Sequence, residues 1–190
     1  LYMPGHGTGT LGILAGGKFV GNGFNDKIGG APFAEIIPCR ISNTVVLIKT
    51  SEFAQALNYL SALHKSGEMV HIVSMSMGGA PSQAWADAVN EAYESGILMV
   101  SAAGNNYNGL PIRKLVYPAR FERVIAACGA TFEDAPYYHK KIGEMQGNYG
   151  PPKSMNYALA AYTPNTPWAV SVNKSLSFSG AGTSSATPQI

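Results

Sequence analysis

Three residue types that together could perform acyl transfer lie in separate glycine-rich segments of the 190-residue chain. His6 lies in "GHGTGT", Asn105 in "SAAGNN" and Ser184 in "GAGTSSATP". A serine hydroxyl becomes nucleophilic when a base takes its proton, and histidine suits that task because its pKa lies near neutrality. The tetrahedral intermediate carries an oxyanion, which a side-chain amide and a backbone N–H can stabilise. The segments therefore suggest a serine nucleophile, a histidine base and an asparagine donor.

The histidine segment also allows a different interpretation. Gly7, Gly9 and Gly12 match the G-x-G-x-x-G spacing of a dinucleotide-binding loop. Such a loop follows a strand, and an acidic residue about 20 positions later binds the ribose. Here only "LYMP" precedes the segment, and the next acid, Asp26, lies in the turn-like "GNGFNDKIGG". The context disfavours nucleotide binding, and the glycines are explained if they let a helix pack closely.

Short apolar runs alternate with helical patterns along most of the chain. The pattern predicts strands over 34–41, 69–76, 97–104 and 123–130 and helices over 50–67 and 82–96. Continuous apolar strands separated by amphipathic helices indicate a parallel sheet that is buried on both faces. We therefore expect an α/β domain with a mostly parallel central sheet and helices on both faces. Residues 131–181, rich in Gly, Pro, Asn and Tyr, predict loops and short irregular strands.

The candidate segments follow predicted strands. Functional groups of open α/β sheets gather at the carboxyl ends of the strands. "SMSMGG" (74–79) ends one strand and "SAAGNN" ends the next, while Ser184 follows a turn of small residues. We expect these segments to converge on one site. The other three histidines, in a helix end, a strand and a loop, are expected to be structural or solvated: His64, His71 and His139.

The composition disfavours several classes of function. A net charge of +2 without a basic run gives no indication of nucleic acid binding, and no apolar run reaches the roughly 18 residues of a membrane span. Cys39 and Cys128 are expected to be inert thiols in buried strands, with no disulfide framework. Unpaired thiols favour a cytoplasmic location weakly over a secreted one. No metal site and no cofactor are expected.

In combination, the motifs resemble those of the subtilisin-like serine proteases (subtilases, peptidase family S8). "GHGTGTLGILAG" is similar to the family's histidine block, "AAGNN" to its oxyanion block and "GTSSATP" to its serine block. "SMSMGG" resembles the strand that pairs with the bound peptide, and "YPARFERVIAACGA" resembles the following core strand. The resemblance extends from residue 5 to 188 and is thin over 131–178. It implies a three-layer subtilisin-like fold and a serine endopeptidase acting through an acyl-enzyme.

The resemblance implies roles for individual residues. His6 is the general base and then the general acid, Ser184 is the nucleophile, and the Asn105 amide donates to the oxyanion together with the Ser184 backbone N–H. One wall of the cleft, offering backbone hydrogen bonds to an extended polypeptide substrate, is formed by Ser76, Met77 and Gly78. The opposite wall of the main specificity pocket is formed by Ala102, Ala103 and Gly104. Its floor lies near Val116 and Tyr117.

The chain departs from the family pattern at several positions. Many relatives have Gly at the position of Val116, so its β-branched side chain predicts a shorter pocket that prefers small or medium apolar substrate side chains. Many also have a second His at the position of Gly9 and a Met at that of Ser185. "FNDKIG" (24–29) resembles a calcium-binding loop of some subtilases, but an ordinary Asn-Asp turn is the better interpretation. We therefore expect no cofactor, and bound calcium is kept as the alternative.

The third catalytic group of the family has no counterpart in the chain. That group is an aspartate that holds the imidazole in its tautomer, on a strand upstream of the histidine block. The aspartates present lie in no matching motif: Asp26, Asp87 and Asp134. We expect residues 1–190 to be one catalytic domain, cut short at both ends. The upstream aspartate strand and the rest of the serine helix would then be missing, and a prosegment or another part of the protein would supply the aspartate.

Two other functions are left as alternatives. The first is a catalytically inactive module with the same fold that binds peptides without cutting them. The second is an esterase that uses the same serine and histidine. The esterase is disfavoured because "GAGTSSA" lacks the second glycine of the G-x-S-x-G elbow that this class requires.

Overall fold

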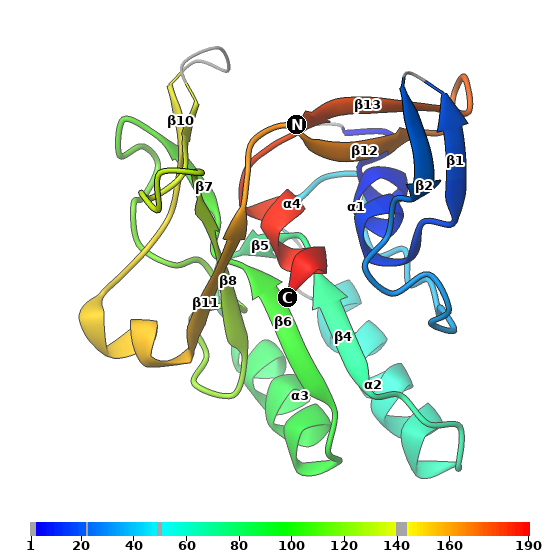
Figure 1. Ribbon diagram of the computed structural model, residues 1–190. Helices are drawn as coiled ribbons and strands as arrows, with labels where there is room; N and C mark the ends of the chain where they lie inside the picture. Colours follow the sequence, from blue (N-terminus) through cyan, green and yellow to red (C-terminus); the bar gives the residue numbers. More distant parts are fainter. Residues whose placement is uncertain (1–2, 22, 49–50, 140–143) are drawn as a thin grey trace.

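A four-stranded parallel sheet forms the centre of the molecule. The computed structural model describes residues 3–21, 23–48, 51–139 and 144–190. The strands lie in the order β11-β8-β6-β4 and pair in parallel throughout (Figure 1). Their bounds are Ala158–Tyr162 (β11), Ile125–Ala130 (β8), Leu98–Ala102 (β6) and Ile72–Met75 (β4). The expected α/β class with a parallel sheet is confirmed.

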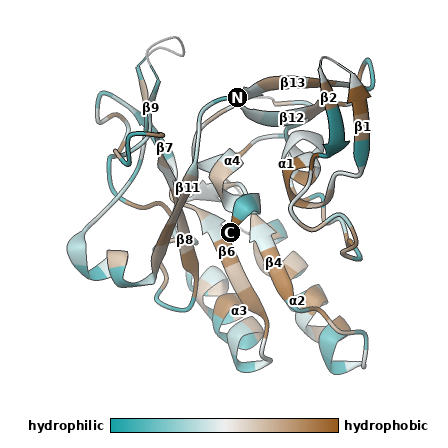
Figure 2. Cartoon of the chain, in the orientation of Figure 1, coloured by the Kyte–Doolittle hydropathy of each residue, from teal (hydrophilic) through white to brown (hydrophobic). Residues whose placement is uncertain are grey.

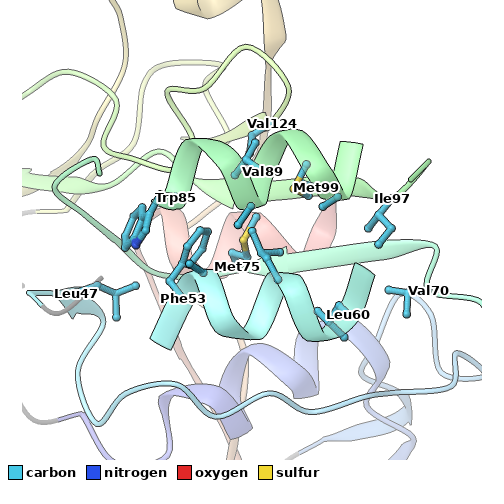
Figure 3. Close-up of a cluster of buried hydrophobic side chains, with 14 residues drawn as sticks. Leu47, Phe53, Leu60, Val70, Met75, Trp85, Val89, Ile97, Met99 and Val124 are labelled. Atoms are coloured by element: carbon cyan, nitrogen blue, oxygen red, sulfur yellow. The ribbon is translucent and has the colours of Figure 1, made fainter. Parts of the chain in front are cut away.

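Two helices cover one face of this sheet. They are α2 (Ser51–Lys65) and α3 (Gln83–Glu94), and they pack against each other as well as against the strands. The rings of Phe53 and Trp85 meet between the helices with centroids 4.2 Å apart. Figure 3 shows this core, whose larger buried members are Leu47, Phe53, Leu57, Leu60, Val70, Met75, Trp85, Val89, Ile97, Met99 and Val124. Burial of these side chains fixes the helices to the sheet.

Shorter helical segments lie against the opposite face, at the carboxyl ends of the strands. They are α4 (Thr183–Ala186) and the 3₁₀ turn η2 (Thr187–Gln189), and both contact β6 (Figure 1). Helix α1 (His6–Ala15) packs in turn on α4 and η2. Towards the amino ends of the strands this face carries exposed apolar side chains, and Figure 2 shows the hydrophobic character of β4.

The remaining strands form small sheets around the centre. A hairpin of β12 (Thr166–Val170) and β13 (Ser175–Gly180) packs on α1, and β13 leads directly into α4. A second hairpin consists of β1 (Lys18–Gly21) and β2 (Phe24–Lys27). The other small sheets are β7 (Asn105–Tyr107) with β10 (Met145–Gly147) and β9 (Tyr138–His139), and β3 (Val46–Leu47) with β5 (Gly78–Gly79). A 3₁₀ helix, η1 (Pro152–Tyr157), precedes β11.

The predicted strand over 34–41 is wrong. The segment has no regular secondary structure, and its Ile37 and Ile41 only pack against the edge of the α2–α3 core. Pro38 cannot donate a ladder hydrogen bond, and β4, the outer strand of the sheet, pairs only with β6. Cys39 is consequently exposed rather than buried, whereas Cys128 is buried in β8 as predicted. Both thiols are free.

Two further segments are more regular than the sequence suggested. The calcium-like stretch "FNDKIG" is not an Asn-Asp turn, because its first four residues form β2 and the Asp26 carboxylate accepts the N–H of Lys27 at 2.7 Å. Within 131–181, β11 joins the central sheet and β12 and β13 form a regular hairpin. None of the helices in the described residues combines the length and the hydrophobicity needed to cross a bilayer.

Candidate active site

Ser184 lies in the first turn of α4, next to the end of β4. Gly182, at the N-cap, has a φ of 76°, a conformation that favours glycine. The Ser184 side chain is nearly buried, and its Oγ donates a long hydrogen bond of 3.5 Å to the Ser76 carbonyl. In return the Ser76 hydroxyl donates to the Ser184 carbonyl at 2.8 Å. These two contacts fix the start of α4 against the segment that follows β4.

Asn105, the first residue of β7, reaches the same turn from the segment that follows β6. Its Oδ1 accepts the backbone N–H of Thr183 at 3.0 Å, and the Thr183 hydroxyl accepts the N–H of Gly104 at 3.0 Å. The amide also lies directly against Gly182, where an added Cβ would stand 2.9 Å from Asn105 Nδ2. Because Oδ1 accepts the Thr183 N–H, the donor group of this amide, Nδ2, is not used in that hydrogen bond.

His6 is the first residue of α1, and α1 contacts α4. Its half-buried ring meets the Trp168 ring edge-on, with centroids 5.5 Å apart and an interplanar angle of 70°. Burial lowers the pKa of His6 below its ordinary value of 6.5, which favours the neutral imidazole that can act as a base. In the described part of the chain no hydrogen bond joins this ring to Ser184, whose hydroxyl is turned towards Ser76.

None of the three aspartates holds the His6 ring within the described residues. Asp26 lies in the exposed strand β2, and Asp87 on α3 accepts a hydrogen bond from Gln83 at 2.8 Å. Asp134 lies in the loop after β8 with a φ of 58°. The described residues also contain no group of three or more His, Cys, Asp or Glu side chains placed to hold a metal ion.

The specificity-pocket residues converge around Val116. An added Cβ on Gly78 would lie 2.5 Å from Val116 Cγ2, and one on Gly104 would lie 2.8 Å from Val116 Cγ1. Both glycines therefore leave room for the same isopropyl group, one from each expected wall. The Val116 N–H also donates to the Ala103 carbonyl at 3.0 Å, which fixes the side chain between the walls. The space between Gly78 and Gly104 is filled.

The other expected wall residues contribute backbone rather than side chains. Ala102 and Ala103 are buried, and the Ala103 N–H donates to Ala127 at 3.0 Å across the sheet. Met77 and Tyr117 pack their side chains against the α2–α3 core. The Tyr117 carbonyl accepts the N–H of Gly79 at 2.8 Å, next to the expected wall residue Gly78.

The strand edge expected to receive a substrate is occupied by the chain itself. The Gly78 N–H donates to the Val45 carbonyl at 3.0 Å, and β5 pairs in parallel with β3. The Gly79 N–H is taken by Tyr117 on the other side. In this structure a peptide could therefore add as a strand at Gly78 only if the β3 pairing gave way.

Two residues of this region escaped the sequence interpretation. Thr183 joins the turn that carries Ser184 to both Gly104 and Asn105 through hydrogen bonds, and its position directly before Ser184 could have suggested such a role. Trp168 contacts His6 from a segment that was expected to be irregular. The signal that could have indicated it is the glycine at position 9, since Gly9 leaves the space that the indole fills.

Two of the three glycines that suggested a dinucleotide loop, Gly9 and Gly12, serve packing instead. Gly7, Gly9 and Gly12 all lie inside α1, and no described strand precedes them. Gly9 faces Trp168, and Gly12 faces Ala169, whose Cβ would lie 2.7 Å from an added Cβ. A surface groove of about 580 Å³ elsewhere on the molecule is lined only by residues of α2 and α3 and holds none of the candidate site.

A parallel α/β sheet carries a serine at a helix start, an asparagine beside it and a histidine on a neighbouring helix, which is the set of groups expected of a serine hydrolase. Residues 2–190 match the Subtilase family (peptidase S8). The chain belongs to this family.

Individual relatives agree with this assignment. The Minor extracellular protease Epr of Bacillus subtilis (strain 168) is 36% identical over 123 residues, which are 64% of this chain and 17% of Epr. Subtilisin Savinase of Lederbergia lenta is 31% identical over 128 residues, 67% of this chain and 42% of that protein. The chain thus spans less than half the length of these relatives.

Solved structures share the fold at low sequence identity. "Structure of Prenylagaramide maturation protease PagA" superposes with a TM-score of 0.69 and 18% identity, over 98% of this chain and 62% of that one. "PatG macrocyclase in complex with peptide" gives a TM-score of 0.57 and 19% identity, over 75% of this chain and 38% of that one.

Proposed function

We propose that the protein is a serine endopeptidase that cleaves polypeptides, with Ser184 as nucleophile, His6 as base and Asn105 as oxyanion donor. The observation that carries the proposal is the hydrogen bond from the Thr183 N–H to Asn105 Oδ1 at 3.0 Å. It brings a side-chain amide next to the N–H of the nucleophile, which is the pair of donors that acyl transfer requires. Membership in the Subtilase family supports the same reaction.

The proposed reaction proceeds in two halves. The Ser184 oxygen bonds to the carbonyl carbon of the scissile peptide while its proton passes to the His6 imidazole, and the carbonyl oxygen becomes an oxyanion. Collapse of the intermediate breaks the C–N bond, and the imidazolium gives its proton to the leaving nitrogen. Water then hydrolyses the acyl-serine by the same route. The Ser184 hydroxyl now donates a long hydrogen bond to the Ser76 carbonyl. It must rotate away from this carbonyl before the first step.

The proposal includes a carboxylate supplied from outside residues 1–190. A triad histidine needs a carboxylate to hold its tautomer and stabilise the imidazolium, and no aspartate of the described residues lies at His6. We assign this group to another part of the same protein. A peptide-binding module without catalysis is the second candidate, favoured by the absence of a hydrogen bond between His6 and Ser184 in the described residues.

Labelling with a fluorophosphonate, followed by mass mapping of the adduct, tests the proposal. The protein would be produced with all the sequence that flanks these residues in its gene, and any inhibitory segment would be removed. We expect an adduct on Ser184, none in Ser184→Ala or His6→Ala, and a turnover of peptide substrates that falls roughly 10²–10³-fold in Asn105→Ala.

The adjacent serine provides a matched control. The Ser185 hydroxyl is fully buried and bonds to the Thr163 hydroxyl and the Gly182 carbonyl, each at 3.0 Å. Ser185→Ala should therefore retain the adduct on Ser184. If the folded protein gave no adduct on Ser184, the endopeptidase assignment would be wrong and the binding module would replace it.

A further inference from the structure

The indole of Trp168 is the group that touches the candidate base. The two rings meet edge to face with centroids 5.5 Å apart, within the 4.5–7 Å range that aromatic pairs prefer. Trp168 lies on β12, far from His6 in sequence, and is brought to it because the β12–β13 hairpin packs on α1. The catalytic assignments above do not use this residue.

Gly9 on α1 makes room for the indole. It lies three residues after His6, so the two share one face of the helix. An added Cβ on Gly9 would stand 1.9 Å from Trp168 Cε2, closer than any side chain could approach. The indole thus occupies the volume that a side chain of α1 would otherwise fill beside His6.

A second glycine limits the indole from the hairpin side. An added Cβ on Gly180 would lie 3.0 Å from Trp168 Cε3 and 2.1 Å from Thr166 Oγ1. Gly180 is the last residue of β13, and the chain reaches Ser184 four residues later. The indole therefore contacts both the helix that carries His6 and the strand that delivers Ser184.

In the described residues, the main elements packed on α1 bring no charged side chain that could compete with this contact for the orientation of the imidazole. Apart from His6, the described α1 and the elements packed on it, namely β12, α4 and η2, contain no ionisable side chain. The pKa of His6 is lowered by burial, the only cause of its shift. Within the described residues the ring is positioned by packing, and Trp168 supplies the aromatic part of that packing.

We propose that Trp168 is a positioning residue: its indole, held between Gly9 and Gly180, sets the orientation of the His6 imidazole relative to the turn that carries Ser184. The proposal rests on the proposed function for its catalytic meaning. The contact itself can be tested without any activity.

The test is an NMR pH titration of the His6 ring protons in the complete gene product, with His6→Ala used for assignment. Three variants change the contact: Trp168→Ala, the milder Trp168→Phe, and Gly9→Ala, whose Cβ displaces the indole. Each should move the His6 chemical shifts and raise the pKa of His6 above its value in the wild-type protein, because water reaches the ring and the burial that lowers the pKa is relieved. Trp168→Phe should lie between wild type and Trp168→Ala.

Gly12→Ala is the matched control. It disturbs the same packing of α1 on β12, one turn farther along, because its Cβ would meet Ala169 rather than Trp168. It should lower stability and leave the His6 titration unchanged. In peptide hydrolysis Trp168→Ala should lower kcat roughly 10–100-fold with little change of KM, since misplacement of a catalytic group by about 1 Å has effects of that size.

Two results would overturn the proposal. One is a His6 titration in Trp168→Ala and Gly9→Ala that coincides with that of wild type. The other is a change of the His6 pKa and chemical shifts in Gly12→Ala as large as in Gly9→Ala. It would mean that any disturbance of the α1–β12 packing affects His6 and that Trp168 has no specific role. The titration does not depend on turnover, so a failure of Ser184 to react with fluorophosphonate is distinguished from a failure of the Trp168 contact.

Discussion

The Val116 side chain fills the space between the two expected walls of the specificity pocket. Its isopropyl group lies against Gly78 on one wall and Gly104 on the other, with added-Cβ distances of 2.5 Å and 2.8 Å. The sequence had suggested a shortened pocket from the β-branched residue alone. The structure supports that hypothesis with a specific arrangement, because Gly78 and Gly104 both lie against the methyl groups of Val116. If a substrate side chain enters between these walls, as we propose, the isopropyl group excludes a large one.

Val116→Gly is expected to widen the preference for the residue before the cleaved bond. In a peptide library the wild-type protein should favour small or medium apolar side chains, and the variant should gain at least about tenfold in kcat/KM for Phe or Tyr, within the range seen for added pocket volume. Val20→Gly, at an exposed position on the distant strand β1, is the control for a Val-to-Gly change. A strong wild-type preference for Phe or Tyr would contradict the prediction.

At the scale of elements, the helices were the most predictable part. The apolar spacing in 50–67 and 82–96 corresponds to α2 and α3, because an amphipathic period is a local property. The strand over 34–41 failed because a strand needs a paired neighbour, which its composition cannot reveal. Strand β11 shows the converse: its sequence did not predict a strand of the central sheet, yet all five of its residues pair with β8.

The candidate site shows the same division between local and long-range information. Gly182, Thr183 and Ser184 are neighbours in sequence, so their turn could be recognised from the chain alone. The approach of Trp168 to His6 depends on a hairpin more than 150 residues away from the helix, and only the folded chain reveals it. The one sign of this contact near His6 in the sequence is Gly9, because a side chain at position 9 would overlap the indole.

Helix α3 offers a test of a single local signal. The Ser82 hydroxyl accepts the N–H of Trp85 at 3.3 Å and so caps the first turn. Ser82→Ala should lower the free energy of unfolding by about 1 kcal/mol, measured by urea denaturation. Ser95 lies at the other end of the same helix, and its exposed hydroxyl donates to the backbone carbonyl of Glu91. Ser95→Ala should therefore change the free energy of unfolding by less than about 0.5 kcal/mol. Equal losses in both variants would refute the capping role.

For the molecule as a whole, the two faces of the central sheet differ. Helices α2 and α3 cover one face, while α4 and η2 cover only the carboxyl-end part of the other. Strand alternation and register put three exposed side chains on that second face: Ile72 (57% exposed), Leu98 (47%) and Leu159 (53%). Ile72 and Leu98 are paired directly across β4 and β6, so they form a continuous apolar surface.

This surface predicts how a polypeptide of residues 1–190 alone would behave. Because exposed contiguous apolar area binds hydrophobic dyes, the native polypeptide should enhance the fluorescence of 8-anilinonaphthalene-1-sulfonate. The double variant Ile72→Thr, Leu98→Thr should lose most of that enhancement and keep its unfolding midpoint, since both side chains are largely in water already. Val172→Thr is the control, because Val172 is 95% exposed but isolated in the β12–β13 turn, so its loss should leave the signal unchanged. A native polypeptide that bound no dye, or a double variant that bound as much as the parent, would contradict the assignment of this face.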